Sequence, residues 1–154
     1  MNQLGGSSFL TEFGGCDDSP TCDDQLNWAL KNADLYFQSW AYWGSVYGDM
    51  ATVKLLSRPY ARAIAGQATA NEYDVSARSF MLQYSHNISI AKPTEIYLSP
   101  LVYPNASYNV TVHGDVQWRV DPTDSNIILV EPIKQRIDSR EESISVKMFI
   151  GPKD

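Results

Sequence analysis

The sequence is poor in histidine, cysteine and basic residues, and it has no long hydrophobic run. Its 154 residues include 2 histidines and 2 cysteines, and 12 basic residues against 18 acidic ones give a net charge of −6. This acidic balance argues against nucleic-acid binding, which needs a basic surface. No apolar run approaches the roughly 20 residues of a membrane-spanning helix. Residues 1–5 lack the basic start and apolar core of a signal peptide.

The histidines and the aspartates predict no metal or cofactor site. His86 and His113 stand alone, without the spacing of metal ligands, and we expect each on a strand or at the surface. The four aspartates within residues 17–24 do not have the spacing of a known calcium loop. A solvated loop followed by a helix cap is the simpler interpretation.

The cysteines and three N-glycosylation sequons point outside the cytosol. Cys16 and Cys22 flank a short acidic loop and are close enough in sequence for a disulfide across a turn. The sequons begin at Asn87, Asn105 and Asn109, all within 25 residues. They favour a secretory route, and thus a secreted, lysosomal or other extracellular location for the complete protein. Since no signal peptide is present, we expect the chain to lack its N-terminal part.

Residues 1–65 show the order strand, helix, strand, helix, which is typical of a parallel α/β sheet or barrel. Asp23 or Asp24 is expected to cap the first helix, and Asp49 the second, because a carboxylate accepts from the free N–H groups of a first turn. Strands are predicted at residues 8–13 and 36–43, and helices from those caps through residues 33 and 56.

Residues 70–154 show no convincing helical pattern and predict an antiparallel β-sandwich, because short alternating runs are separated by Pro and Gly turns. The boundary between the two parts is expected in residues 66–69. Strands are predicted at Ser79–Tyr84, Glu95–Leu98, Tyr108–Val112, Val116–Val120, Asn126–Val130 and Ser143–Ile150.

Residues 9–15 place one carboxylate, Glu12, at the end of an apolar run just before a Gly pair. Barrel enzymes carry their active sites at the C-terminal ends of the strands. From the residues alone, Glu12 is either a catalytic carboxylate or a solvated loop residue. Trp43, at the end of the second strand, is either a sugar-stacking aromatic or a core residue.

Several segments together resemble the C-terminal part of endoglycoceramidases, which are glycosidases of glycoside hydrolase family 5. The resemblance covers nearly the whole chain in the right order. The segments are Thr11-Glu12-Phe13-Gly14, Ser39-Trp40-Ala41-Tyr42-Trp43, Arg58-Pro59-Tyr60-Ala61-Arg62-Ala63-Ile64-Ala65-Gly66, Phe80-Met81-Leu82-Gln83-Tyr84, Pro93-Thr94-Glu95-Ile96-Tyr97 and Tyr103-Pro104.

The resemblance implies an α+β chain in two parts. Residues 1–65 would be the last two βα units of a (β/α)8 TIM barrel, and residues 70–154 a C-terminal antiparallel β-sandwich. Glu12 would be the nucleophile and Trp43 the aromatic floor of the sugar site, with Tyr47 lining the same cleft. Retaining hydrolysis needs a second carboxyl group about 5–5.5 Å from the first. The family's acid/base Glu lies on a strand that this chain does not contain.

Two kinds of function follow from these patterns. The first is an endoglycoceramidase-type hydrolase of glycosphingolipids, present as a C-terminal portion that is inactive alone. The second is a non-catalytic sandwich that binds glycolipid or a membrane surface through Trp43 or through exposed aromatics such as Tyr97 and Tyr103. A purely structural role of the sandwich in supporting a barrel is the third interpretation.

Overall fold

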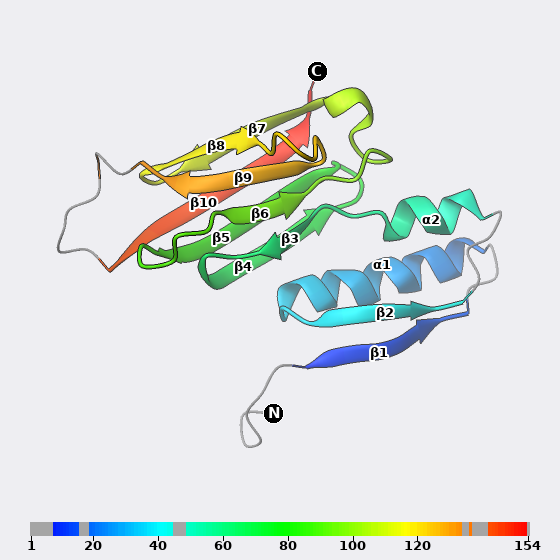
Figure 1. The fold of residues 1–154 in the computed structure, drawn as a ribbon. Helices are drawn as coiled ribbons and strands as arrows, with labels where there is room; N and C mark the ends of the chain where they lie inside the picture. Colours follow the sequence, from blue (N-terminus) through cyan, green and yellow to red (C-terminus); the bar gives the residue numbers. More distant parts are fainter. Residues whose placement is uncertain (1–7, 16–18, 45–48, 134–135, 137–141, 154) are drawn as a thin grey trace. The chain divides into compact units, whose positions relative to one another are not determined.

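The computed structural model describes residues 8–15, 19–44, 49–133, 136 and 142–153. The chain is an α+β protein of mostly antiparallel strands with two helices in the described part (Figure 1). It divides into two compact units, Met1–Leu56 and Ser57–Asp154. The elements of the first unit are β1 (Phe9–Gly14), α1 (Pro20–Leu35), β2 (Ser39–Trp43) and α2 (Met50–Leu56).

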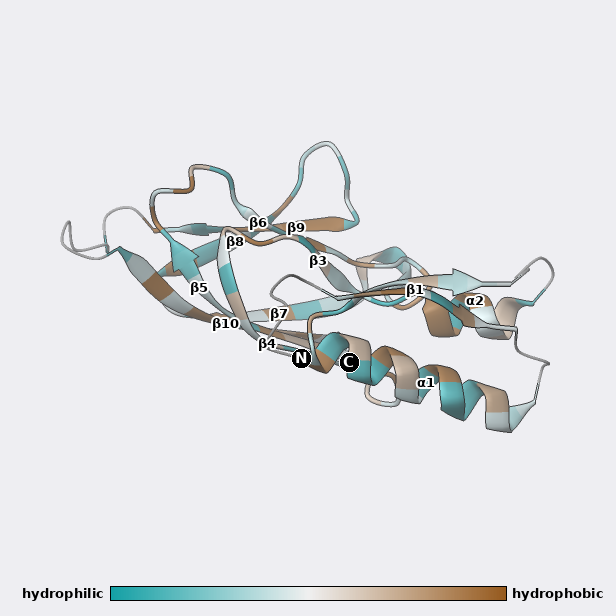
Figure 2. Ribbon diagram, turned by 90° about the horizontal axis from the view of Figure 1, so that it is seen from below, coloured by the Kyte–Doolittle hydropathy of each residue, from teal (hydrophilic) through white to brown (hydrophobic). Residues whose placement is uncertain are grey.

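In the first unit, β1 and β2 form a parallel pair that α1 connects. Parallel neighbours require a crossover connection of this kind, because a tight turn can join only antiparallel strands. Leu26, Leu30 and Ala33 are the buried residues of α1, and their spacing places them on one face of the helix. Figure 2 shows hydrophobic and hydrophilic residues alternating along α1, as this spacing requires.

The starts of the two helices differ in how well the sequence predicted them. Asp49 caps α2 as expected, and its Oδ1 accepts from the N–H groups of Ala51 and Thr52 at 3.0 Å each. The prediction of Asp23 or Asp24 as the cap of α1 is wrong. Ser19 is the N-cap, followed by Pro20 in the first turn. Proline suits this position because its missing N–H would have no partner there.

The second unit consists of two four-stranded antiparallel sheets, as the sandwich prediction expected. We call them the β10 sheet, in the order β4-β5-β10-β7, and the β9 sheet, in the order β3-β6-β9-β8. The elements are β3 (Tyr60–Ala63), β4 (Gly66–Asp74), β5 (Ser79–Asn87), β6 (Thr94–Tyr97), η1 (Pro104–Ala106), β7 (Tyr108–His113), β8 (Val116–Val120), β9 (Ile127–Pro132) and β10 (Ser143–Pro152).

The core of the second unit comes from alternate residues of the central strands. On β10, burial alternates strictly between exposed and buried from Ser143 to Ile150, because successive side chains of a strand point to opposite faces. The largest fully buried side chains of the unit are Tyr84, Phe80, Leu82, Ile96, Ile127, Ile128, Met148, Ile150, His86, Val130 and Val146.

The chain divides between Leu56 and Ser57, earlier than the predicted boundary. Residues 66–69, expected as the link, begin β4 and pair with β5. Just before them, β3 pairs with β6, and the Arg62 Nε–H donates to Glu95 Oε2 at 2.8 Å across that pair. The small residues of this stretch gave no hydrophobic alternation from which these two strands could be predicted.

Candidate active site

Glu12 lies on β1 at an irregularity in its pairing with β2. Leu10 pairs with Trp40, but Phe13 pairs with Tyr42, so two residues of β1 stand opposite one residue of β2. An extra residue of this kind bends a strand and redirects its side chains, and such bulges are frequent beside active sites. Glu12 is one of the two residues and is exposed.

The aromatic residues of β1 and β2 establish which face Glu12 occupies. The Phe13 ring meets the rings of Trp40 and Tyr42 edge to face, at centroid distances of 5.7 and 5.8 Å. These three half-buried residues therefore share one face of the pair. Side chains alternate along β2, so Ala41 and Trp43 lie on the opposite face. Glu12 stands opposite Ala41 in the bulge and precedes Phe13, and it therefore lies on the same face as Trp43.

The C-terminal ends of β1 and β2 are held close together by backbone contacts. The Gly15 N–H donates to the Trp43 carbonyl oxygen at 3.0 Å. Gly14 has a φ of 133°, and a Cβ there would meet the Trp43 carbonyl oxygen and the Tyr42 ring. Glycine allows both this conformation and this close approach. The glycine pair after Glu12 thus brings the end of β1 against the residue that carries the Trp43 side chain.

Trp43 ends β2 with 67% of its surface exposed. A flat indole can bury the apolar C–H face of a sugar without needing polar partners. Parallel strands end at the same edge of their sheet, so an exposed carboxylate and an exposed indole approach one edge and share one face. This arrangement can hold a sugar ring beside a carboxylate.

A second carboxylate for retaining hydrolysis is absent from β1 and β2, since Glu12 is the one acidic residue of the two strands. A glycosidase pair therefore cannot form within this two-stranded sheet. Within the described residues, no group of three or more His, Cys, Asp or Glu side chains could hold a metal ion. In the same part of the chain, no helix is both long enough and apolar enough to cross a membrane.

An open hollow of about 540 Å³ lies on the other side of the β1–β2 pair. It is lined by Phe13, by the start of α1 and by Trp28, whose surface is 71% exposed. Because Phe13 faces away from Glu12, this hollow is separate from the candidate active site. Sequence reasoning did not single out Trp28, since its helical position predicts neither burial nor function.

The remaining predicted site residues lie at other places in the chain. Tyr47 and Cys16 are outside the described residues. Cys22 is disulfide-bonded, and its pairing with Cys16 stays a prediction. The three sequon asparagines Asn87, Asn105 and Asn109 all belong to the second unit and are exposed.

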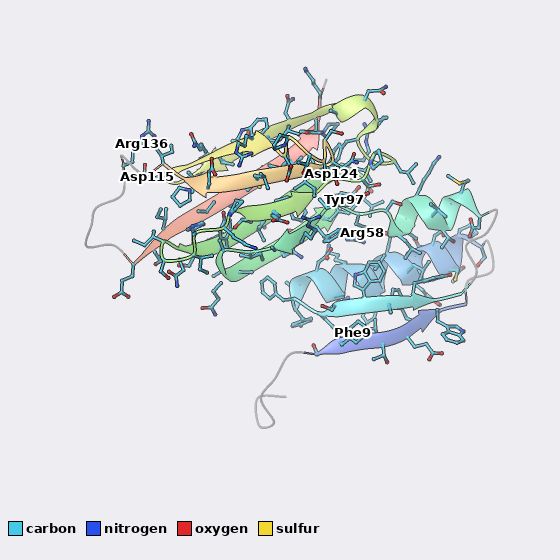
Figure 3. The ribbon with its side chains drawn as sticks, in the orientation of Figure 1. Phe9, Arg58, Tyr97, Asp115, Asp124 and Arg136 are labelled. Carbon is cyan, nitrogen blue, oxygen red and sulfur yellow. The ribbon has the colours of Figure 1, made fainter. Side chains whose placement is uncertain are left out.

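Tyr103 is not an exposed aromatic, and the expectation that it could bind a lipid surface is wrong. It is 3% exposed, and its hydroxyl donates to the Arg78 carbonyl oxygen at 2.6 Å. Burial raises the pKa of Tyr103 well above its ordinary value of 10. Tyr97 (Figure 3) is half-buried and packs against Tyr60 at a centroid distance of 5.3 Å.

Arg58, the first residue of the Arg-Pro-Tyr segment, is a buried core residue of the second unit (Figure 3). Its guanidinium lies 5.0 Å from the centre of the Tyr73 ring, and Nη2 donates to the Tyr73 carbonyl oxygen at 3.4 Å. Arg58 thereby fixes the chain just before β3 to the end of β4. Packing against Tyr73 thus explains the arginine of the Arg-Pro-Tyr segment.

The sequence profile of the glycoside hydrolase family 5 C-terminal domain matches residues 58–146. This range is more than half of the chain. The chain belongs to this family. The matched range begins at Arg58, close to the division between Leu56 and Ser57, and contains β3 to β9 and part of β10. A comparison with curated protein sequences gives no match.

Solved structures with a similar fold extend over both units of the chain. Endo-glycoceramidase II from Rhodococcus sp., in an iminocyclitol complex, is 23% identical with a TM-score of 0.72, over 96% of this chain and 33% of that one. Its ganglioside complex gives 21% identity and a TM-score of 0.70, over 96% and 32%. Cryptococcus neoformans sterylglucosidase 1 gives 11% and 0.62, over 88% and 25%.

This family member thus spans about a third of the length of endo-glycoceramidase II. At these identities the likeness concerns the fold. Since it covers 96% of the chain, it includes elements of the first unit as well as the sandwich.

Proposed function

We propose that this chain is the C-terminal portion of an endoglycoceramidase-type glycoside hydrolase. Its first unit would be the last two βα units of a (β/α)8 barrel, with Glu12 as the nucleophile. The observation that carries the proposal is the position of Glu12 at a bulge of β1, on the same face as the exposed Trp43. The similarity of the fold to endo-glycoceramidase II over 96% of the chain supports it.

In the proposed mechanism, a Glu12 carboxylate oxygen attacks the anomeric carbon of the sugar while the bond from that carbon to the leaving oxygen breaks. The result is a covalent glycosyl-enzyme, which water then hydrolyses with retention of configuration. A lactosyl-enzyme intermediate is known for endo-glycoceramidase II. Trp43 would stack on the sugar, and Tyr47 would line the cleft. A second carboxyl group, from a strand outside this chain, would protonate the leaving oxygen and later activate water.

The proposed substrate is a glycosphingolipid, cleaved between its oligosaccharide and its ceramide. The similar endo-glycoceramidase II forms a complex with a ganglioside, which supports this substrate class. We further propose that the complete protein follows the secretory route to a lysosomal or extracellular location. The exposure of all three sequon asparagines is compatible with that route.

A chimera tests the catalytic proposal. Residues 8–154 would replace the matching C-terminal third of endo-glycoceramidase II, which supplies the missing strands and the acid/base carboxylate. The chimera should release oligosaccharide from a ganglioside, and Glu12→Gln should lower kcat by about 10⁴-fold or more, since the amide cannot attack. Glu72→Gln, which alters an exposed carboxylate on β4, is the matched control and should leave kcat unchanged. A folded chimera whose activity survives Glu12→Gln contradicts the proposal.

A further inference from the structure

Phe149 is an exposed aromatic residue on the outer face of the β10 sheet. It is 40% exposed, while its neighbours along the strand, Met148 and Ile150, are buried in the core. Strand β10 is an inner strand of its sheet, with β5 on one side and β7 on the other. Phe149 therefore lies within the outer face of the sheet, and part of its surface stays in contact with water.

The pairing of β10 with β7 identifies the residues around the ring. Thr111 stands directly opposite Phe149, and His113 and Asn109 are the two diagonal neighbours on β7. Diagonal neighbours lie about 7–8 Å apart, within reach of long side chains. His113 makes this diagonal contact, with its ring 6.2 Å from the Phe149 ring and edge-on to it. Asn109 occupies the other diagonal position and begins a sequon, Asn109-Val110-Thr111.

Along β10, the two sides of Phe149 differ. On one side, the Lys147 Nζ lies 4.9 Å from the ring centre. On the other side is Gly151, which pairs with Asn109. Among the described residues, no atom outside Gly151 and its two chain neighbours comes within 4 Å of the point where a Cβ of Gly151 would lie. The face is thus open between the Asn109 side chain and the Phe149 ring.

We propose that a glycan attached to Asn109 lies on this face, with its first sugar residue over Gly151 and against the Phe149 ring. The apolar C–H side of a sugar suits an exposed aromatic ring, which buries area without needing a polar partner. Thr111 supplies the sequon hydroxyl on the same exposed face, opposite Phe149. The inference rests on the proposed secretory route.

The attachment follows the chemistry of sequons. The donor is a lipid-linked oligosaccharide pyrophosphate, and the acceptor is Asn109 Nδ2. A bond forms between Nδ2 and the anomeric carbon of the first sugar, and the bond between that carbon and the pyrophosphate oxygen breaks. The lipid pyrophosphate leaves, and one amide proton passes to the solvent.

The other two sequons have different surroundings. Asn87 is the last residue of β5 and pairs with Ser143 of β10, and its Oδ1 accepts from the Ser89 N–H at 2.9 Å and from the Ser89 hydroxyl at 2.7 Å. Asn105 has a φ of 53° and lines a hollow with Tyr103 and Tyr108. Neither pairs across a sheet with a glycine beside an exposed ring, so we assign the contact with Phe149 to Asn109.

The test uses the full chain, secreted from a eukaryotic host that adds high-mannose glycans. Peptide mapping after enzymatic deglycosylation in ¹⁸O water should mark Asn109 as occupied. Thr111→Ala should remove this mark and Thr111→Ser should keep it. Trimming each glycan to its first sugar should leave the Tm of the second unit unchanged. Complete removal of the glycans should lower this Tm by a few degrees. In the variant Phe149→Ser, or in Phe149→Leu if the serine variant does not fold, complete removal of the glycans should not change the Tm.

An NMR spectrum of the trimmed protein should show contacts between protons of the first sugar and the Phe149 ring. An unoccupied Asn109, an equal loss of Tm with and without Phe149, or the absence of these contacts would overturn the inference. So would full restoration of the Tm by free chitobiose added to the deglycosylated chain, since the face would then bind free sugar. None of these measurements uses hydrolase activity, so they can fail or succeed independently of the catalytic proposal.

Discussion

His86 is a fully buried side chain of β5, between the sheets of the second unit. Its accessible surface is 0%, and neither Nδ1 nor Nε2 has a hydrogen-bond partner. Three uncharged residues are its neighbours: Tyr84 contacts its ring, and Gly66 and Ile144 are its partners on the two adjacent strands. Burial lowers the pKa of His86 below its ordinary value of 6.5, because an apolar site disfavours the imidazolium.

This lowered pKa makes stability depend on pH in one direction. The unfolded chain binds a proton on His86 more readily than the folded chain, so folding stability is complete above pH 6.5 and falls as the pH drops below it. His86→Leu removes both the proton and the unpaired nitrogens. We expect it to raise the free energy of unfolding by about 1 kcal/mol at pH 7, and by more at pH 5.5.

Urea unfolding of both proteins at several pH values measures this difference. His113→Gln is the control, because His113 is exposed on the outer face of the same sheet. A pH dependence that is the same in the wild type and in His86→Leu would contradict the assignment.

Gly66 lies where the backbone of the second unit leaves no room for a side chain. It has a φ of 150°, and a Cβ there would meet the Ser85 carbonyl oxygen on β5. Gly66→Ala should lower the free energy of unfolding by about 1–3 kcal/mol. Gly151→Ala is the matched control, because open space surrounds that position. Thermal unfolding of the two variants should separate them, and equal Tm values would show that Gly66 is not strained.

At the residue scale, sequence reasoning selected candidates where a motif surrounds the residue. Glu12 and Trp43 were singled out by their strand-end positions, although their catalytic roles remain proposals. The burial of His86 was not expected, yet it continues the inward side of β5 set by Phe80, Leu82 and Tyr84. Alternation counted across the whole strand predicts it. Tyr103 was misjudged because its core position depends on packing against residues distant in sequence.

At the element scale, strands with strong alternation were predicted and strands of small residues were missed. The runs at β5, β7, β8 and β10 appear close to the expected positions. By contrast, β3 and the start of β4 consist largely of Ala, Gly, Thr and Gln, whose hydrophobic pattern is weak. Their strand conformation is determined by pairing with β6 and β5, which local sequence does not encode.

The presence of β3 and of the first residues of β4 determines which fragment should fold alone. Residues 57–154 keep β3 beside β6 and all of β4 beside β5, and they should unfold in one cooperative transition. Residues 70–154 lack β3 and four residues of β4, and they lose the buried Arg58 that packs on Tyr73. We expect the shorter fragment to have a clearly lower Tm or to be unfolded. Thermal melts by circular dichroism compare the two, and equal stability would contradict the structural boundary.

At the scale of the whole molecule, the first unit presents a two-stranded parallel sheet with exposed aromatic residues. A two-stranded sheet is marginally stable, and parallel sheets are normally covered on both faces. The barrel to which we assign it needs strands that this chain does not supply. Sequence alone could predict the order of these elements, but not the strands that complete the sheet.

The chain on its own should therefore have no glycosidase activity. The two strands of the first unit hold one carboxylate, whereas retaining hydrolysis needs two about 5–5.5 Å apart. Incubation of the 154-residue chain with a ganglioside should release no oligosaccharide above background. Release that disappears in Glu12→Gln would show that the chain holds a complete catalytic pair.

Covalent trapping of the chimera with endo-glycoceramidase II tests the central claim most directly. An activated 2-deoxy-2-fluoro glycoside forms the glycosyl-enzyme quickly and releases it slowly, so the nucleophile keeps the sugar. Mass spectrometry of the digested protein should find this sugar on the peptide that contains Glu12, and Glu12→Gln should abolish the label. A label on any other carboxylate, or an active chimera in which Glu12 stays unlabelled, would contradict the account.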